Sequence, residues 1–130
     1  MQLFLPGSST HPIVVFDLKQ GFLRIDGMSN MQHAQLFYKE VGDWLVKHKS
    51  HIRPGTELVL RLLYLNSGSQ KALYQLFLTI AREGLPIGVT LVLSKRLGNE
   101  DTVELLSQIC KLVGLPCCVR EESGEAKAAF

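Results

Sequence analysis

Two stretches of the chain end in the same tripeptide, Gly-Leu-Pro, at residues 84–86 and 114–116. In both, apolar residues at helical spacing precede the glycine, and an apolar strand pattern lies beyond the proline. Glycine can take the left-handed conformation that ends a helix, the leucine can pack back, and proline prevents continuation. Each tripeptide therefore predicts a helix end that leads into a strand, which restricts the chain to folds that alternate these elements.

The remaining patterns extend this alternation towards the N-terminus. Residues 13–16 and 22–25 are β-rich runs around a turn, so we expect a hairpin, with Gly27 ending its second strand. Residues 58–65 are apolar on both faces except Arg61, the pattern of a central strand covered on both sides. Further strands are expected at 89–93 and 117–120.

Three helices are expected between these strands. Ser29 and Gln32 have the spacing of a capping box, with Asn30 as a competing cap, so the first helix should begin there. Gly42 falls within it, where we expect another element to pack close. The second helix should begin near 67–69. The three apolar stripes are Ala34, Phe37, Val41, Trp44, Leu45 and His48; Leu73, Leu76, Phe77 and Ile80; and Val103, Leu106, Ile109, Cys110 and Val113.

The order β-β-α-β-α-β-α-β predicts an α/β fold with a mixed sheet of about five strands. Its core should be parallel, with an antiparallel N-terminal edge. We expect one domain over residues 1–120 and a flexible C-terminal tail over 121–130. A length of 130 residues suits one domain with a sizeable core.

Charge and composition exclude several classes of protein. The 14 Lys and Arg residues are interleaved with 12 Asp and Glu residues, a net charge of +2, so no basic stripe for nucleic acid is expected. No apolar run is long enough for a bilayer helix, and the N-terminus has no signal-peptide pattern. Three cysteines make no disulfide framework, which favours a cytoplasmic protein with reduced thiols.

The sequence contains no convincing metal or catalytic site. His48 and His51 lie three apart without a nearby thiol or carboxylate, and the adjacent Cys117 and Cys118 should be two buried cysteines on opposite strand faces. Cys110 belongs to an apolar stripe. Acidic residues at 100, 101 and 104 suit the start of a helix, where the macrodipole favours negative charge. We therefore predict no metal, no cofactor and no enzymatic activity.

One segment has two interpretations: Tyr64, Leu65, Asn66, Ser67, Gly68, Ser69, Gln70 and Lys71. Here a buried strand turns directly into a helix. Asn and Ser are preferred N-caps, so the hydroxyls can serve the helix start. Alternatively, one hydroxyl is modified, because a phosphate there would meet free backbone N–H groups. Lys71 could pair with a phosphate on Ser67 if Ser67 lies in the first turn.

At this point the sequence resembles the SiaC-type regulatory phosphoproteins of bacteria, which are similar to the STAS domains of anti-sigma-factor antagonists. The matching residues are spread over most of the first 80 positions, whereas the last 40 or so agree in pattern only. They are Asp17, Gly21, Leu23, Ile25, Gly27, Ser29, Ala34, Phe37, Tyr38, Trp44 and Leu45, then 62–66 followed by Ser67, Ser69 and Lys71.

The resemblance implies a STAS-like fold and partner switching. The family's segment after the buried strand typically reads Asn-Thr-Ser-Ser-x-Lys, and its phosphorylated Thr falls on Ser67. A Ser/Thr kinase would modify the site and a metal-dependent Ser/Thr phosphatase would reverse this. The unmodified form would bind an output protein such as a diguanylate cyclase, through Tyr64, Asn66, Ser67, Gly68, Ser69 and Lys71.

Two departures from the family pattern bear on this hypothesis. Ser67 replaces Thr and Gly68 replaces Ser, so the modified residue could instead be Ser69. The Pro-Glu-Asn-Ala run that often opens the family's first helix is Met-Gln-His-Ala at 31–34, so the partner could differ. The alternatives are an unswitched scaffold relative, or a small-ligand or lipid-binding α/β domain that uses the same strand ends.

Overall fold

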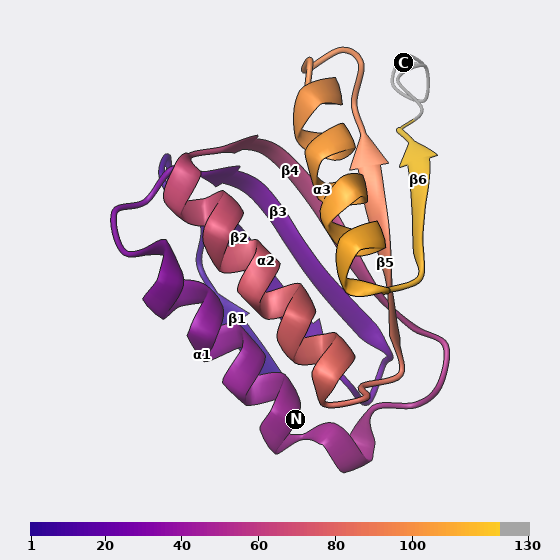
Figure 1. The fold of residues 1–130 in the computed structure, drawn as a ribbon. Helices are drawn as coiled ribbons and strands as arrows, with labels where there is room; N and C mark the ends of the chain where they lie inside the picture. Colours follow the sequence, from indigo (N-terminus) through magenta and orange to yellow (C-terminus); the bar gives the residue numbers. More distant parts are fainter. Residues whose placement is uncertain (123–130) are drawn as a thin grey trace, which may run out of the picture.

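The computed structural model describes residues 1–122 and shows a six-stranded sheet with three helices (Figure 1). The helices are α1 (Ala34–Lys47), α2 (Ser67–Arg82) and α3 (Glu100–Val113), with a short 3-10 helix, η1 (Lys49–His51), after α1. The strands are β1 (Gln2–Leu5), β2 (Ile13–Asp17), β3 (Phe22–Ser29), β4 (Thr56–Leu65), β5 (Ile87–Leu93) and β6 (Cys117–Glu121).

The strands lie in the sheet in their sequence order, from β1 to β6. β1, β2 and β3 pair antiparallel, and β3 to β6 pair parallel, so the predicted α/β fold with an antiparallel edge is confirmed. The sequence analysis missed β1, a four-residue edge strand. Only Leu3 and Leu5 pack against the core, and Phe4 between them is 61% exposed.

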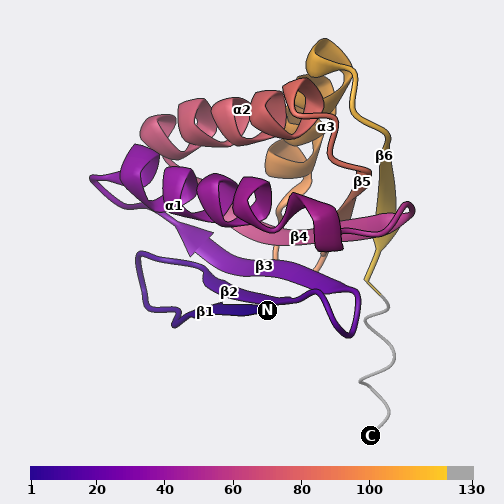
Figure 2. The ribbon, with the colours of Figure 1, turned by 90° about the horizontal axis from the view of Figure 1, so that it is seen from below.

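All three helices pack on the same face of the sheet (Figure 2). Right-handed crossovers that move in one direction across a sheet place every helix on one side, and this sheet runs from β3 to β6 without reversing. The prediction that β4 is covered on both sides by other layers is therefore wrong. The face of the sheet opposite the three helices, which we call the outer face, carries no helix among the described residues.

Arg61 on β4 forms ion pairs with neighbouring side chains on this outer face. Its guanidinium donates to Asp26 on β3 at 3.1 Å and to Glu122, just after β6, at 2.6 Å. Arg24 also pairs with Asp26, at 2.8 Å. The hydrogen bond between the two side chains raises the pKa of Arg61, which Glu122 stabilises in its charged form, and lowers the pKa of Glu122, which Arg61 stabilises in its charged form. A network of charged side chains thus crosses the outer face where the sequence showed a single interruption.

Both Gly-Leu-Pro tripeptides end helices as predicted. Gly84 and Gly114 have φ values of 65° and 82°, in the left-handed region. The N–H of Leu85 donates to the carbonyl of Ile80, and that of Leu115 to the carbonyl of Cys110. Both leucines are buried, so each helix end is closed by the same local geometry.

The apolar stripes of the three helices pack against the core as predicted. In α1, Ala34, Val41 and Leu45 are buried and Phe37 and Trp44 are half-buried against the core; Tyr38, which the predicted stripe left out, is buried as well. Gly42 faces α2, where an added Cβ would lie 3.3 Å from Leu76 Cδ1. The expectation that another element packs close to Gly42 is confirmed.

The predicted start of the first helix is wrong. α1 begins at Ala34, and Ser29 belongs to β3, which continues past Gly27. Gly27 has a φ of +126°, a conformation that side chains rarely adopt, yet it remains within the ladder. Next to it the register shifts: Gly27 pairs with Leu62 and Met28 with Tyr64, which leaves Leu63 without a partner on β3.

The cysteine prediction is confirmed in part. Cys110 is buried in α3, but Cys117 is half-buried and Cys118 is exposed, so these two are not a buried pair. Glu121 belongs to β6 and not to the expected tail, and residues 123–130 of that tail lie outside the described part of the chain. Within residues 1–122, no helix has the length and apolar character needed to cross a membrane.

Candidate functional site

The segment from Asn66 to Lys71 lies where β4 turns directly into α2. Asn66 is the N-cap of α2: its side-chain oxygen accepts from the N–H of Ser69 at 2.9 Å. Its side-chain amide donates to the carbonyl of Met31, and its backbone N–H donates to the carbonyl of Ser29. The cap therefore also attaches the start of α2 to the end of β3.

Three buried hydroxyls reinforce this attachment, and we call them the hydroxyl chain: Tyr38, Ser29 and Ser69. Ser69 donates to the carbonyl of Ser29 at 3.0 Å, and the Ser29 hydroxyl donates to Ser69 Oγ at 2.7 Å. Because the single proton of Ser29 is used there, Tyr38 donates to Ser29 Oγ, at 2.8 Å. Burial raises the pKa of Tyr38, so its proton is retained. The hydroxyl chain thus links α1, β3 and α2.

The two candidate serines have different surroundings. Ser67 is the first residue of α2 and is exposed, with Lys71 one turn later on the same helix. Ser69 is fully buried within the hydroxyl chain. The condition that Ser67 belongs to the first helical turn is therefore met. A modifying enzyme could reach Ser67 in this structure, whereas Ser69 would require the helix start to open.

Ser67 borders a hollow of about 450 Å³ between the first turns of α1 and α2. We call it the N-terminal hollow; it is lined by Gln32, His33, Ala34, Gln35, Leu36, Ser67, Gly68 and Lys71. Among the described residues, those lining it include one lysine, one histidine and no carboxylate. The sequence analysis missed the α1 contribution, because it placed residues 29–32 at a capped helix start.

Two further residues of the predicted binding segment differ in their positions. Gly68 faces Ala34, and an added Cβ would lie 3.9 Å from the Ala34 Cβ, an ordinary contact. The serine of the family pattern would thus have room for its Cβ here. Tyr64 is 46% exposed, and its neighbour Leu65 belongs to the core, so Tyr64 points to the outer face beside Met28.

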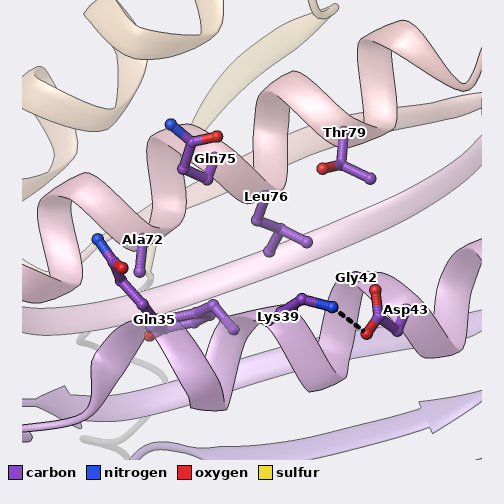
Figure 3. Close-up of a pocket in the computed structure, with 9 residues that line it drawn as sticks. Gln35, Lys39, Gly42, Asp43, Ala72, Gln75, Leu76 and Thr79 are labelled. Atoms are coloured by element: carbon purple, nitrogen blue, oxygen red, sulfur yellow. Dashed lines mark hydrogen bonds and ion pairs between the residues drawn. The ribbon is translucent and has the colours of Figure 1, made fainter.

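A second hollow of about 410 Å³ lies between α1 and α2, beside the first (Figure 3). Gln35 lines both hollows. Ala72, Gly42 and Leu76 contribute its apolar part, and Lys39 and Asp43 form an ion pair of 2.8 Å at its rim. Gln75 and Thr79 complete its polar lining, which does not favour an apolar or lipid ligand.

The described residues offer little for metal or nucleophilic chemistry. In residues 1–122, no three His, Cys, Asp or Glu side chains gather in a way that could hold a metal ion. His48 Nδ1 lies 2.9 Å from the carbonyl of Trp44, one helical turn earlier. Burial raises the pKa of the Cys110 thiol, which disfavours the reactive thiolate.

The site thus combines an exposed hydroxyl, Ser67, with a helix start that Asn66 and the hydroxyl chain hold against β3. The comparisons with known proteins identify the class. The model of the SiaC family of regulatory phosphoproteins matches residues 5–111, and the chain belongs to this family.

Individual relatives agree with this assignment. An uncharacterized protein of Pseudomonas aeruginosa strain UCBPP-PA14 is 28% identical over 122 residues, which cover 91% of this chain and 94% of the relative. The crystal structure of apo-SiaC from P. aeruginosa has a TM-score of 0.78 at 26% identity, covering 92% of this chain and 98% of that one. A chain in the crystal structure of the diguanylate cyclase SiaD in complex with its activator SiaC, also from P. aeruginosa, has the same score at 27% identity, covering 92% and 99%.

Proposed function

We propose that this chain is a phosphorylation-controlled partner-switching protein whose modified residue is Ser67. The unmodified form binds an output protein, a diguanylate cyclase, and the form phosphorylated on Ser67 releases it. A Ser/Thr kinase and a metal-dependent Ser/Thr phosphatase set the balance between the two forms in the cytoplasm. The chain itself performs no catalysis, in keeping with its membership of a family of regulatory phosphoproteins.

The contrast between Ser67 and Ser69 carries this proposal. Ser67 is exposed on the first turn of α2, whereas the buried Ser69 hydroxyl accepts one hydrogen bond from Ser29 Oγ and donates one to the Ser29 carbonyl. Phosphorylating Ser69 would break two buried hydrogen bonds and place a charge among apolar side chains, at a cost of several kcal/mol. Phosphorylating Ser67 breaks no hydrogen bond between described side chains.

The expected effect of the phosphate is electrostatic. A phosphoserine adds about −1.5 to −2 charges at neutral pH. At Ser67 it would stand at the edge of the N-terminal hollow, next to Lys71 and the first-turn N–H groups of α2, where negative charge is stabilised. A partner seated on this surface would have to desolvate that charge, so docking weakens while the fold persists.

A relative supports the choice of output protein. SiaC of P. aeruginosa is the activator of the diguanylate cyclase SiaD and forms a complex with it. The two chains share the fold along almost their whole lengths. For the present chain we therefore propose a diguanylate cyclase as the partner, contacted by residues around Ser67.

The first test is phosphopeptide mass spectrometry on the protein purified from its own host with the phosphatase gene deleted. Trypsin cuts after Arg61 and Lys71, so the peptide 62–71 carries Tyr64, Ser67 and Ser69 as its only acceptors. We expect phosphate on Ser67. Phosphate on Ser69 would refute the accessibility argument, and an unmodified peptide would point to an unswitched scaffold.

The second test compares binding by variants. Ser67→Ala should co-purify with the host's diguanylate cyclase, and Ser67→Asp should not. Ser50→Asp is a matched control, because Ser50 is exposed in η1 beyond the opposite end of α1 and should leave binding unchanged. Equal recovery of the cyclase with Ser67→Asp and Ser67→Ala would contradict the switch.

A further inference from the structure

We propose that the N-terminal hollow receives an acidic segment of the output partner, with a carboxylate beside Lys71 and an apolar side chain against Leu36. This inference rests on the proposed switch at Ser67 and adds the chemistry of the partner. It also explains how the switch works: the Ser67 phosphate and the partner's carboxylate are alternative occupants of one hollow.

The charge of the site supports an acidic occupant. The chain has no Asp or Glu between Asp26 and Glu40, nor between Glu57 and Glu83, although it has 12 in total. These two acid-free stretches supply both walls of the N-terminal hollow. Lys71 and His33 are exposed there, and neither appears among the ion pairs of the described residues. An acidic partner would therefore meet complementary charge and no repulsion.

An apolar contact is available at the same place. Leu36 lines the hollow from α1 and is 69% exposed. It lies on the first turn of α1, opposite the turn of α2 that carries Ser67 and Lys71. An exposed leucine by itself indicates little, but here it borders a hollow with a free lysine. Apolar anchors surrounded by polar groups are the usual arrangement at interface hot spots.

The same charges explain the sign of the switch. In the unmodified chain the side chains of the hollow carry a positive charge from Lys71. A phosphate on Ser67 would reverse that charge, since it adds nearly two negative units at one edge of the hollow. Lys71 would then pair within the chain and no longer be available to a carboxylate. An acidic segment would be repelled, whereas a basic partner would bind more tightly after phosphorylation.

The test needs only the purified chain, produced without its kinase, and a library of random linear peptides displayed on phage. Enriched peptides are synthesised with a fluorophore, and their affinity is measured by anisotropy at low and high salt. The variants are Leu36→Ala and Lys71→Glu. The matched controls are Leu112→Ala on α3, where the leucine is 75% exposed, and Arg120→Glu on the exposed edge strand β6.

We expect the enriched peptides to combine Asp or Glu with a large apolar residue. Leu36→Ala should weaken binding about tenfold. Lys71→Glu should weaken it about fivefold at low salt and less at high salt, because an exposed ion pair is screened. Phosphoserine installed at position 67 by amber suppression should weaken it at least as much as both changes together. The two control variants should bind like the parent chain.

Three outcomes would overturn the inference: enrichment of basic peptides, binding that both Leu36→Ala and Lys71→Glu leave intact, or no enrichment at all. A concentration-dependent dimer that Leu36→Ala abolishes would overturn it too, by assigning the hollow to a second copy of the chain. These results are separate from the proposed function, because Ser67 could be phosphorylated in the host while the partner binds elsewhere. Conversely, an unmodified Ser67 would refute the switch and leave the peptide data standing.

Discussion

The hydroxyl chain predicts an order of stabilities that a different arrangement would not produce. Ser69→Ala removes the Oγ that accepts from Ser29 and donates to the Ser29 carbonyl. Ser29 and Tyr38 then have two buried hydroxyl protons but only one hydrogen bond between them, so one of these protons has no acceptor, whereas the Ser29 carbonyl keeps its bond from the N–H of Asn66. Tyr38→Phe removes only one donor to Ser29 Oγ, and Ser29 still donates to Ser69.

The expected magnitudes follow from these partners. Two lost hydrogen bonds at about 1 kcal/mol each, one of which leaves a buried hydroxyl unmatched, put Ser69→Ala at about 2–4 kcal/mol. Tyr38→Phe should cost about 1 kcal/mol, because no donor is left without an acceptor. Ser67→Ala should lie within about 0.5 kcal/mol of the parent, since Ser67 is exposed.

Urea denaturation at equilibrium measures all three variants. The only tryptophan, Trp44, lies half-buried in α1 with its ring 5.7 Å from that of Phe16, so its fluorescence should report unfolding. Linear extrapolation gives the free energy of unfolding in water. The reasoning would be refuted if Ser69→Ala were as stable as Ser67→Ala, or if Tyr38→Phe were the more damaging change.

Three further predictions concern glycine, pH and thiols. Gly114→Ala should destabilise the fold by about 1 kcal/mol, because Gly114 has a φ of 82°. Gly68→Ala should stabilise the fold by about 0.5–1 kcal/mol, because Gly68 lies in a helix with room for a Cβ. Thermal unfolding of both variants measures the difference. Arg61 lowers the pKa of Glu122, so the contribution of Glu122 to stability is complete above its ordinary pKa of 4.5 and is lost as the pH falls through the lower pKa of the folded state. In Glu122→Gln, the midpoint of urea unfolding should therefore depend less on pH in the acid range. A thiol reagent should label the exposed Cys118 at once and the buried Cys110 only on unfolding, as peptide mass spectrometry can show; equal rates would contradict the assigned burial.

Local rules predicted the parts of the fold that neighbouring residues determine. The two Gly-Leu-Pro helix ends and the stripe of Leu73, Leu76, Phe77 and Ile80 depend on contacts a few residues apart, and the structure shows them as expected. The edge strand β1 was missed because four residues at the chain start acquire strand structure only by pairing with β2. The outer face of β4 was misjudged because Arg61 finds its partners on β3 and beyond β6.

The candidate site shows the same division. Asn66 as a cap and Ser67 in the first turn follow from residue preferences at a strand-to-helix turn. Ser29 has the spacing of a capping box with Gln32, yet its hydroxyl bonds to Ser69, 40 residues later. No local pattern distinguishes these two uses of a serine, so the hydroxyl chain and the contribution of α1 to the hollow required the fold.

The unpaired Leu63 has a consequence for insertions and deletions in this chain. Up to Leu62 the inward positions of β4 are even-numbered, and after Leu63 the inward position is Leu65. Because of this extra residue, α2 begins one residue later in the sequence than it would after an unbroken strand of the same length. A shift of one residue moves every following side chain to the opposite face of a strand. If Leu63 paired with Met28 in an unbroken ladder, Tyr64 would turn inward and Leu65 outward, and Asn66 would be carried away from the Ser29 carbonyl. Deleting residue 63 would instead remove the bulge and keep Tyr64 outward and Leu65 inward, whereas one residue added between Leu65 and Asn66 would displace the cap. The geometry of Ser67 thus depends on the number of residues before it as well as on their identity.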